Sequence, residues 1–283
     1  MSKQSAREDI HRQLDPHYFS DYAIFTGAFR SYVVRTLEEA FRRNPGPKDY
    51  QQRLLIVALY REEYAAYEDL GAFLNSLLCW TKKKLTYPLE RILSYSPDRV
   101  TLERILAENK IESAEDLHAA LALDEWIPAQ WESIHPQIDC KKVLRSICRF
   151  IFTDCLKSQK RYGIEAYNRI KHGLALVPSG QRYVAALPNA PAVIIKHSDR
   201  SAAEPYQLLG LPMPVAQLEQ RCEAVIFVQA ALRLLAALYV MRRYPTFVKD
   251  NFSLDPAPRM FDYPTMTDVK DFMLQVTADK SLI

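Results

Sequence analysis

Apolar residues recur at intervals of three and four along most of this 283-residue chain. That spacing places them on one face of an α-helix, and helices of this kind pack against one another through their apolar faces. The pattern therefore predicts a mainly α fold, a helical bundle with long core helices. The predicted helices cover residues 19–43, 49–80, 139–162, 164–177 and 215–243.

Shorter elements are predicted between these helices. Thr101 and Ser113 each precede a short apolar run and can cap a helix N-terminus through their hydroxyl groups. We read the surrounding region, 95–136, as a helical insertion between bundle helices. The segments 182–187 and 192–197 are rich in strand-forming residues around two prolines, which predicts a small β-hairpin excursion.

The predicted domain organisation follows from these elements. A polar, loose or partly helical lead-in over 1–18 is followed by a single helical domain over 19–243, within which 95–136 is inserted. A tail over 244–283 contains one short helix. The length suits one large domain with a substantial core.

Composition excludes several function classes. The chain has 7 glycines, against roughly 20 at average usage, and it contains neither the GxGxxG nor the GxxxxGK[ST] nucleotide motif. Its five cysteines form no CxxC pair, and residues 1–16 have no apolar signal-peptide core, so we expect a cytoplasmic protein. Arg233 interrupts the apolar stretch 224–241. An arginine there costs about 2.5–3.5 kcal/mol on membrane insertion, so we expect a buried helix and no membrane.

One stretch gathers chemically capable side chains, namely Tyr167-Asn168-Arg169-Ile170-Lys171-His172-Gly173. On a helix, Asn168 and His172 share a polar stripe with Arg161 and Glu165. Asn168 and His172 are therefore the candidate catalytic residues, with His172 as general acid or base in RNA cleavage. The structural alternative is that His172 occupies a last helical turn that Gly173 caps.

This stretch resembles the YNxxKHG-like signature of HEPN-like helical proteins, and residues 62–73 are similar to their first long core helix. The resemblance implies an all-α bundle that forms dimers. It implies either a metal-independent endoribonuclease with an Arg-x4–6-His motif or a noncatalytic binding module. The positions at which His172 requires that arginine hold Glu165, Ala166 and Tyr167. The resemblance therefore favours a noncatalytic module.

Basic residues accumulate before and within this stretch. Residues 141–171 contain nine Lys and Arg against two Asp and Glu, while the whole chain has a net charge of +3. Such a row can follow phosphates without reading sequence; the alternative is a solvated face that pairs with the acidic second helix. The predicted nucleic-acid or anion-binding residues are Lys141, Arg145, Arg149, Lys157, Arg161, Arg169 and Lys171.

Two glutamates are predicted to support this surface. Glu62 and Glu63 border the apolar stripe of the second helix and are expected to reach solvent or to pair with a neighbouring helix, with Lys171 or His172 as the functional partners. Glu115 and His118 have the Glu-x-x-His spacing of di-iron carboxylate bundles, which need a second copy that this chain lacks. We therefore expect no metal and no cofactor.

The leading hypothesis is a noncatalytic HEPN-like module that binds RNA, a nucleotide or a protein partner, as a homodimer. Its binding surface would combine the basic helix 141–161 with the corner formed by Asn168, Lys171 and His172. One alternative is a metal-independent endoribonuclease that uses His172 at a dimer interface. Another is a structural subunit of a protein assembly, with the apolar helix 215–243 as its interface.

Overall fold

The structure is a computed structural model, and it describes residues 3–22, 27–43, 50–94, 101–127, 139–157, 176–178, 192–197, 206–210 and 218–244. Side chains are described for residues 10–22, 29–43, 54–94, 101–127, 139–157 and 218–244.

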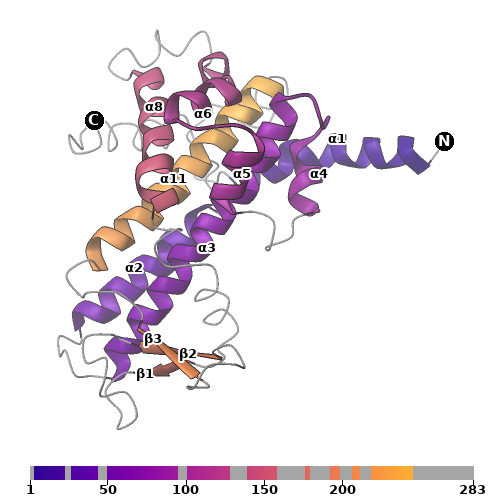
Figure 1. Cartoon of the computed structure of the whole chain (residues 1–283). Coiled ribbons are helices and arrows are strands. Elements are labelled where there is room, and N and C mark those ends of the chain that lie inside the picture. The colour runs from indigo at the N-terminus through magenta and orange to yellow at the C-terminus, as the bar shows by residue number, and fades with distance from the viewer. Residues whose placement is uncertain are drawn as a thin grey trace, which may run out of the picture. The chain divides into compact units, whose positions relative to one another are not determined.

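The described residues are mainly α-helical, as the apolar periodicity predicts (Figure 1). The first three described helices are long, shorter ones follow, and the last described helix is long again; a 3-10 helix (η3) and a π-helix (η4) occur among the shorter ones. In chain order the helices are α1 Lys3–Asp21, α2 Gly27–Arg43, α3 Tyr50–Thr81, α4 Pro88–Leu93, α5 Leu102–Glu108, α6 Ala114–Leu121, η3 Leu123–Trp126, α8 Cys140–Phe150, η4 Ile151–Cys155 and α11 Leu218–Arg243.

The chain forms two compact units. Unit 1 comprises Met1–Phe29, Tyr67–Lys157 and Val228–Ile283, and unit 2 comprises Arg30–Ala66 and Ser158–Phe227. Helices α3 and α11 each contribute one part to either unit. The predicted domain boundaries stay predictions.

The core of unit 1 contains a cluster of aromatic rings. Phe19 of α1 lies 5.3 Å from Phe73 of α3 and 4.6 Å from Tyr239 of α11, measured between ring centroids. Trp80 contacts Tyr239 and Trp126 edge to face at 5.0 and 5.7 Å. Burial of such large rings and their edge-to-face geometry both stabilise a helical core. The cluster therefore joins α1, α3, η3 and α11 within this unit.

Unit 2 is built around a buried ion pair between α3 and α11. Arg221 of α11 donates to the carboxylate of Glu63, and both side chains are more than nine-tenths buried. Beside it in sequence, Glu62 accepts a 2.9 Å hydrogen bond from Arg30 of α2. Both glutamates therefore pair with a neighbouring helix, which confirms one of the two structural expectations for them. Their predicted functional partners, Lys171 and His172, lie outside the described residues.

The single helix predicted over 19–43 is wrong. Helix α1 begins at Lys3, within the predicted lead-in, and ends at Asp21, while α2 begins at Gly27. The apolar spacing over 19–43 extends across two helices, and Phe29, which falls on that spacing, is 63% exposed near the start of α2. Helix α1 includes Pro16 and is anchored by tertiary contacts of its last turns rather than by an apolar stripe of its own.

Three short strands pair antiparallel in the order β1-β2-β3: β1 Leu176–Pro178, β2 Ala192–His197 and β3 Tyr206–Gly210. The predicted hairpin between 182–187 and 192–197 is not supported. Strand β2 pairs with β1 on one side and with β3 on the other, so both of its hydrogen-bonding edges are occupied. Residues 182–187 lie outside the described part of the chain. The helix predicted over 164–177 does not extend to Leu176, where β1 begins.

Helix α11 confirms the predicted apolar helix, which ends at Arg243. Among the described helices, α11 is the one that is long and apolar enough to cross a membrane by length and composition. Core helices of soluble proteins pass the same test, and 61% of its most apolar stretch is buried inside the structure.

Candidate anion-binding site

Helix α8 presents one apolar and one basic face. Its N-terminus is capped by Asp139, whose carboxylate accepts a 3.0 Å hydrogen bond from the backbone N–H of Lys142. Leu144, Ile147 and Cys148 are at most 1% exposed, so this face is fixed in the core of unit 1. The apolar spacing within 139–162 predicts such a buried face, and the structure confirms it. The backbone of α8 therefore gives a rigid support to the side chains on its opposite face.

That opposite face carries a row of cations, Lys141, Arg145 and Arg149, which we call the α8 row. All three are exposed. At 1.5 Å per residue, successive members lie about 6 Å apart along the helix axis. Within the described residues none of them takes part in an ion pair. In the same unit, by contrast, Arg104 pairs with Glu108 and Arg242 pairs with Glu125.

Lys157 follows the α8 row in the chain, but a segment of different helical geometry lies between them. Helix α8 passes directly into the π-helix η4, and Lys157 comes two residues after η4 ends. A π-helix bonds each residue to the fifth one along the chain and is frequently found at functional sites. Lys157 is exposed, but η4 shifts it out of the spacing of the α8 row.

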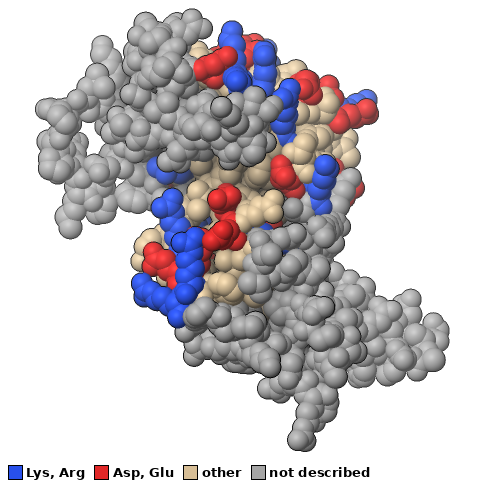
Figure 2. Space-filling view, turned by 90° about the vertical axis from the view of Figure 1, so that its left-hand side faces the viewer, with Lys and Arg blue, Asp and Glu red and all other residues tan. Residues whose placement is uncertain are grey.

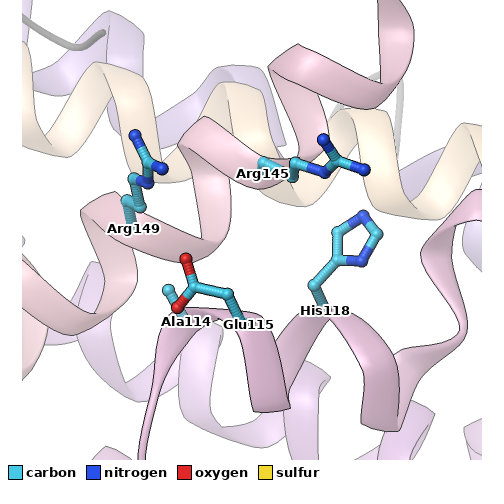
Figure 3. A pocket seen from close by; sticks show the side chains of 5 residues that line it. All are labelled: Ala114, Glu115, His118, Arg145 and Arg149. Carbon is cyan, nitrogen blue, oxygen red and sulfur yellow. The ribbon is translucent and has the colours of Figure 1, made fainter.

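Helix α6 packs against α8 (Figure 1). The two helices form a pocket at the basic face of α8. The pocket has a volume of about 350 Å³ and is lined by Ala114, Glu115 and His118 of α6 and by Arg145 and Arg149 of α8. In Figure 3 the imidazole of His118 and the guanidinium of Arg145 turn toward one another, while the carboxylate of Glu115 turns toward the side of Arg149. Two guanidinium groups, one imidazole and one carboxylate therefore line this α6–α8 pocket, with Arg145 and His118 together at one end and Glu115 at the other.

Helix α6 is held in place by local signals that the sequence displays. Ser113 and Asp116 form a capping box: the Ser113 hydroxyl accepts from the N–H of Asp116 at 3.0 Å, and the Asp116 carboxylate accepts from the N–H of Ser113 at 3.0 Å. Hydrogen bonding to the Ser113 side chain and to the backbone N–H groups of Glu112 and Ser113 holds the pKa of the Asp116 carboxyl below its usual range. Likewise, Thr101 caps α5 through the N–H of Arg104. Both predicted caps are confirmed.

His118 is the least exposed polar group in the pocket, with a side-chain exposure of 12%. Its Nε2 atom is buried and has no hydrogen-bond partner within the described residues. The nearest carboxylate oxygen recorded for it is Oδ1 of Asp124, at 3.6 Å. A buried polar atom without a partner is costly, and native structures leave few of them. His118 therefore has a donor or acceptor position that a ligand can satisfy.

The position of Asp124 beside His118 is fixed by its neighbours in η3. Ala122 adopts a left-handed conformation with φ 51°, and this turn leads the chain from α6 into η3. Trp126 is 1% exposed within the aromatic core, and Glu125 accepts a 2.6 Å hydrogen bond from Arg242 of α11. Asp124 is thus carried by an anchored turn, and its carboxylate lies on the Nε2 side of the imidazole.

Glu115 also lies close to the buried face of α8. Burial raises the pKa of the Cys148 thiol to about 12, and the charge of the Glu115 carboxylate adds to this effect. Cys148 is therefore protonated at neutral pH and serves as packing rather than as a nucleophile. Among the described residues, no group of three or more His, Cys, Asp or Glu is placed to hold a metal ion.

The site is local rather than part of a uniformly basic surface. Figure 2 shows Lys and Arg side chains lying among Asp and Glu side chains on one face of the described residues. This face is therefore not a single broad patch of positive charge. The distinguishing features are the cations of the α8 row, which have no ion-pair partner in the described part of the chain, and the pocket beside them.

The other predicted site residues divide into two groups. Glu62 and Glu63 belong to unit 2, where they pair with arginines. The remaining ones, which include both candidate catalytic residues, lie outside the described residues; they are Arg161, Asn168, Arg169, Lys171 and His172.

His118 is the site residue that the sequence did not identify as an anion partner. Its spacing from Glu115 was considered only for a metal site. The signal that would have found it is the combination of two motifs, Glu-x-x-His on one helix and a basic row on another. The two motifs form one site because α6 packs against α8.

Comparison with protein-family models finds none that matches this chain, and comparison with curated proteins and with solved structures finds no similar protein either. The HEPN-like resemblance therefore stays a prediction, and the candidate site is defined by its geometry.

Proposed function

We propose that this chain is a noncatalytic RNA-binding module whose contact surface is the basic face of α8. The observation that carries the proposal is the α8 row: Lys141, Arg145 and Arg149 are exposed and have no ion-pair partner among the described residues, on a helix whose other face is buried. An exposed cation held on a rigid element neutralises a phosphate without losing an internal partner. Affinity for RNA then arises chiefly from the phosphate backbone.

The spacing of the row supports single-stranded nucleic acid. Cations about 6 Å apart along one helix face can contact successive phosphates of an extended strand. Contacts of this kind to the backbone bind single strands without strong sequence preference. A protein partner would be favoured by an apolar centre, whereas Lys141, Arg145 and Arg149 are surrounded on this face by further exposed polar residues such as Lys142.

Three finer features belong to the same proposal. We propose a HEPN-like bundle, on the basis of the YNxxKHG-type run at 167–173 and the long second helix. We propose that it acts as a cytoplasmic homodimer, as that resemblance implies, and that the corner Asn168, Lys171 and His172 extends the RNA surface. The small β element near 192–197 is proposed as an excursion from the bundle.

The test is fluorescence anisotropy with labelled single-stranded RNA. Reversing two charges of the row, in Arg145→Glu/Arg149→Glu, is expected to weaken binding at least tenfold, because two phosphate contacts become repulsive. The matched control is Lys84→Glu/Arg91→Glu, which changes the net charge equally at two exposed positions outside the pocket. It is expected to change affinity less than threefold.

Two outcomes would overturn the proposal. One is the absence of salt-dependent RNA binding by the unaltered protein. The other is an equal loss in both double variants, which would show that net charge alone is responsible. Cleavage of the RNA in chelator that disappears in His172→Ala would instead establish the ribonuclease alternative.

A further inference from the structure

We infer that the α6–α8 pocket binds a phosphate monoester, the group found on a phosphorylated RNA end or on a nucleoside monophosphate. This inference rests on the proposed function, because it names the part of an RNA that the pocket beside the α8 row would hold. Internal phosphates of the strand would be held by the row, and the monoester by the pocket. Both roles use Arg145 and Arg149, whereas His118 takes part only in binding the monoester.

The donors that line the pocket match a monoester better than an internal diester. A monoester carries a charge of about −1.5 to −2 at neutral pH and offers three acceptor oxygens. An internal diester carries a single charge and continues as a chain on both sides. Arg145 and Arg149 from one helix and His118 from the other line the same pocket, and in Figure 3 the guanidinium of Arg145 lies next to the imidazole of His118. This pair can hold oxygens of one terminal phosphate, and Arg149 adds a positive charge at the other end of the pocket.

His118 gives the pocket its specificity. Its Nε2 atom is buried without a hydrogen-bond partner in the described residues, and in Figure 3 the ring turns toward the guanidinium of Arg145. The same Nε2 atom lies 3.6 Å from Oδ1 of Asp124, beyond hydrogen-bond distance, so its hydrogen-bonding position is open to a phosphate oxygen. Hydrogen bonds between ionised donors and phosphate are the strong ones. A phosphate oxygen between Arg145 and His118 would satisfy both.

Glu115 limits what the pocket accepts. Its carboxylate lines the same space and turns toward the side of Arg149. It repels a second phosphate and so disfavours a strand that continues through the pocket, or a polyphosphate tail. The lining supplies two guanidinium groups, one imidazole and one carboxylate, and the Asp124 carboxylate beside His118 further limits the pocket to one phosphate group. The volume of about 350 Å³ is at the lower end for ligand pockets and matches a single terminal nucleotide.

The experiment compares RNA strands that differ only in one terminal phosphate. Short single strands labelled at the opposite end are prepared with a hydroxyl or a phosphate at the 5′ end, and a second pair with a hydroxyl or a phosphate at the 3′ end. Binding is followed by anisotropy. We expect one phosphorylated end to raise affinity about tenfold over its hydroxyl counterpart, which corresponds to one or two charge-assisted hydrogen bonds.

The ratio of the two affinities is then measured in variants. His118→Ala is expected to bring the ratio close to one while binding of hydroxyl-ended RNA stays within about twofold. Arg145→Ala, at an exposed position, provides a second variant if His118→Ala does not fold, and it should lower both the ratio and the overall affinity. The control Lys84→Ala/Arg91→Ala should leave the ratio unchanged. Glu115→Gln is expected to tighten binding of both forms.

Competition separates the two sources of the monoester. If a nucleoside monophosphate displaces the strand at the concentrations at which phosphorylated RNA does, the free nucleotide is the ligand; if it does not, the RNA end is. Either result supports a monoester site. Equal affinity for phosphate and hydroxyl ends, or an unchanged ratio in both His118→Ala and Arg145→Ala, would overturn the inference while leaving RNA binding by the α8 row intact. If the unaltered protein bound no RNA but bound a nucleotide in a manner that depends on His118, the proposed function would be overturned instead.

Discussion

The phenol of Tyr239 donates a 2.7 Å hydrogen bond to the carboxylate of Asp15, a residue 224 positions earlier in the chain. Tyr244 donates to the same oxygen at 2.9 Å, and the backbone N–H of Leu89 donates to the other at 3.1 Å. Asp15 itself is 0% exposed. One carboxylate therefore joins α1, α4 and the C-terminal end of α11 within unit 1.

Removal of this carboxylate should destabilise the protein strongly. Asp15→Ala leaves the hydroxyl of Tyr239 and the N–H of Leu89 without their acceptor in the core, and each such buried group costs about 1–3 kcal/mol. We expect a loss of about 3 kcal/mol in the free energy of unfolding, measured with urea. The control Asp21→Ala, on the exposed end of the same helix, should stay within about 0.5 kcal/mol. Equal effects of the two substitutions would contradict the anchoring role.

The same carboxylate should give stability a particular pH dependence. Burial raises the pKa of Asp15 above its ordinary value of 3.8, although Tyr239, Leu89 and Tyr244 oppose this through their hydrogen bonds. The folded protein then holds this proton more firmly than the unfolded chain does. The contribution is complete below pH 3.8 and is lost as pH rises through the raised pKa.

Asp15→Asn removes this titration and keeps the shape of the side chain. The difference in free energy of unfolding between the unaltered protein and Asp15→Asn should therefore shift in favour of Asp15→Asn as pH rises above 3.8. Urea titrations at a series of mildly acidic pH values measure it. Carboxylates with lowered pKa values, such as Glu108 and Asp116, cancel in this difference. A difference that is flat with pH would mean that the pKa of Asp15 is not raised.

Removal of one partner of the Glu63–Arg221 ion pair should destabilise the protein strongly, whereas apolar replacement of both partners should not. Removal of one partner, in Glu63→Ala, leaves a charge in a site where both side chains are more than nine-tenths buried. Such a change typically costs 3–5 kcal/mol, whereas apolar replacement of both partners is often neutral. We therefore expect Glu63→Leu/Arg221→Met to recover most of the stability lost in Glu63→Ala. Additive losses in the double variant would indicate that the pair is not coupled.

The neighbouring pair Arg30–Glu62 supplies the internal control. Its side chains are 23% and 15% exposed, so water screens the charges more strongly. The coupling energy from a double-mutant cycle should be about 1 kcal/mol or less. A coupling as large as that of Glu63 and Arg221 would contradict the burial argument.

The five thiols should differ sharply in reactivity. All five cysteines are unpaired with one another, and Cys79 alone is half-buried while the others are buried. Burial raises the pKa of Cys140, Cys148 and Cys222 to about 12, so these thiols carry almost no thiolate at neutral pH. An aromatic disulfide reagent should titrate about one thiol promptly in the native protein and all five in denaturant. Cys79→Ser should abolish the prompt reaction; several prompt equivalents in that variant would show that the core is open.

The sequence predicts the local features of the site well. The buried face of α8 follows from the spacing of Leu144, Ile147 and Cys148, and the starts of α5 and α6 follow from the hydroxyl caps Thr101 and Ser113. These signals are short in range, because a cap or an apolar stripe involves residues within one or two turns. The basic face of α8 is predicted for the same reason.

What the sequence does not predict depends on packing between distant segments. Asp15 reads as an ordinary charged residue of a polar lead-in, and only its contacts with Tyr239 and Leu89 explain why α1 is a helix of the core. His118 has no partner of its own in sequence, and it becomes a candidate ligand only when α6 lies against α8. The hairpin prediction fails similarly, since strand pairing is set by partners, here Leu176–Pro178 and Tyr206–Gly210, rather than by the nearest strand-like segment.

The salt dependence of RNA affinity tests the central claim most directly. For single strands, each phosphate contact contributes about −0.7 to the slope of log affinity against log salt. Removal of two contacts of the α8 row, in Arg145→Ala/Arg149→Ala, should therefore make the slope shallower by about 1.4, while Lys84→Ala/Arg91→Ala leaves it unchanged. An identical slope in the unaltered protein and in Arg145→Ala/Arg149→Ala would contradict RNA binding by the basic face of α8.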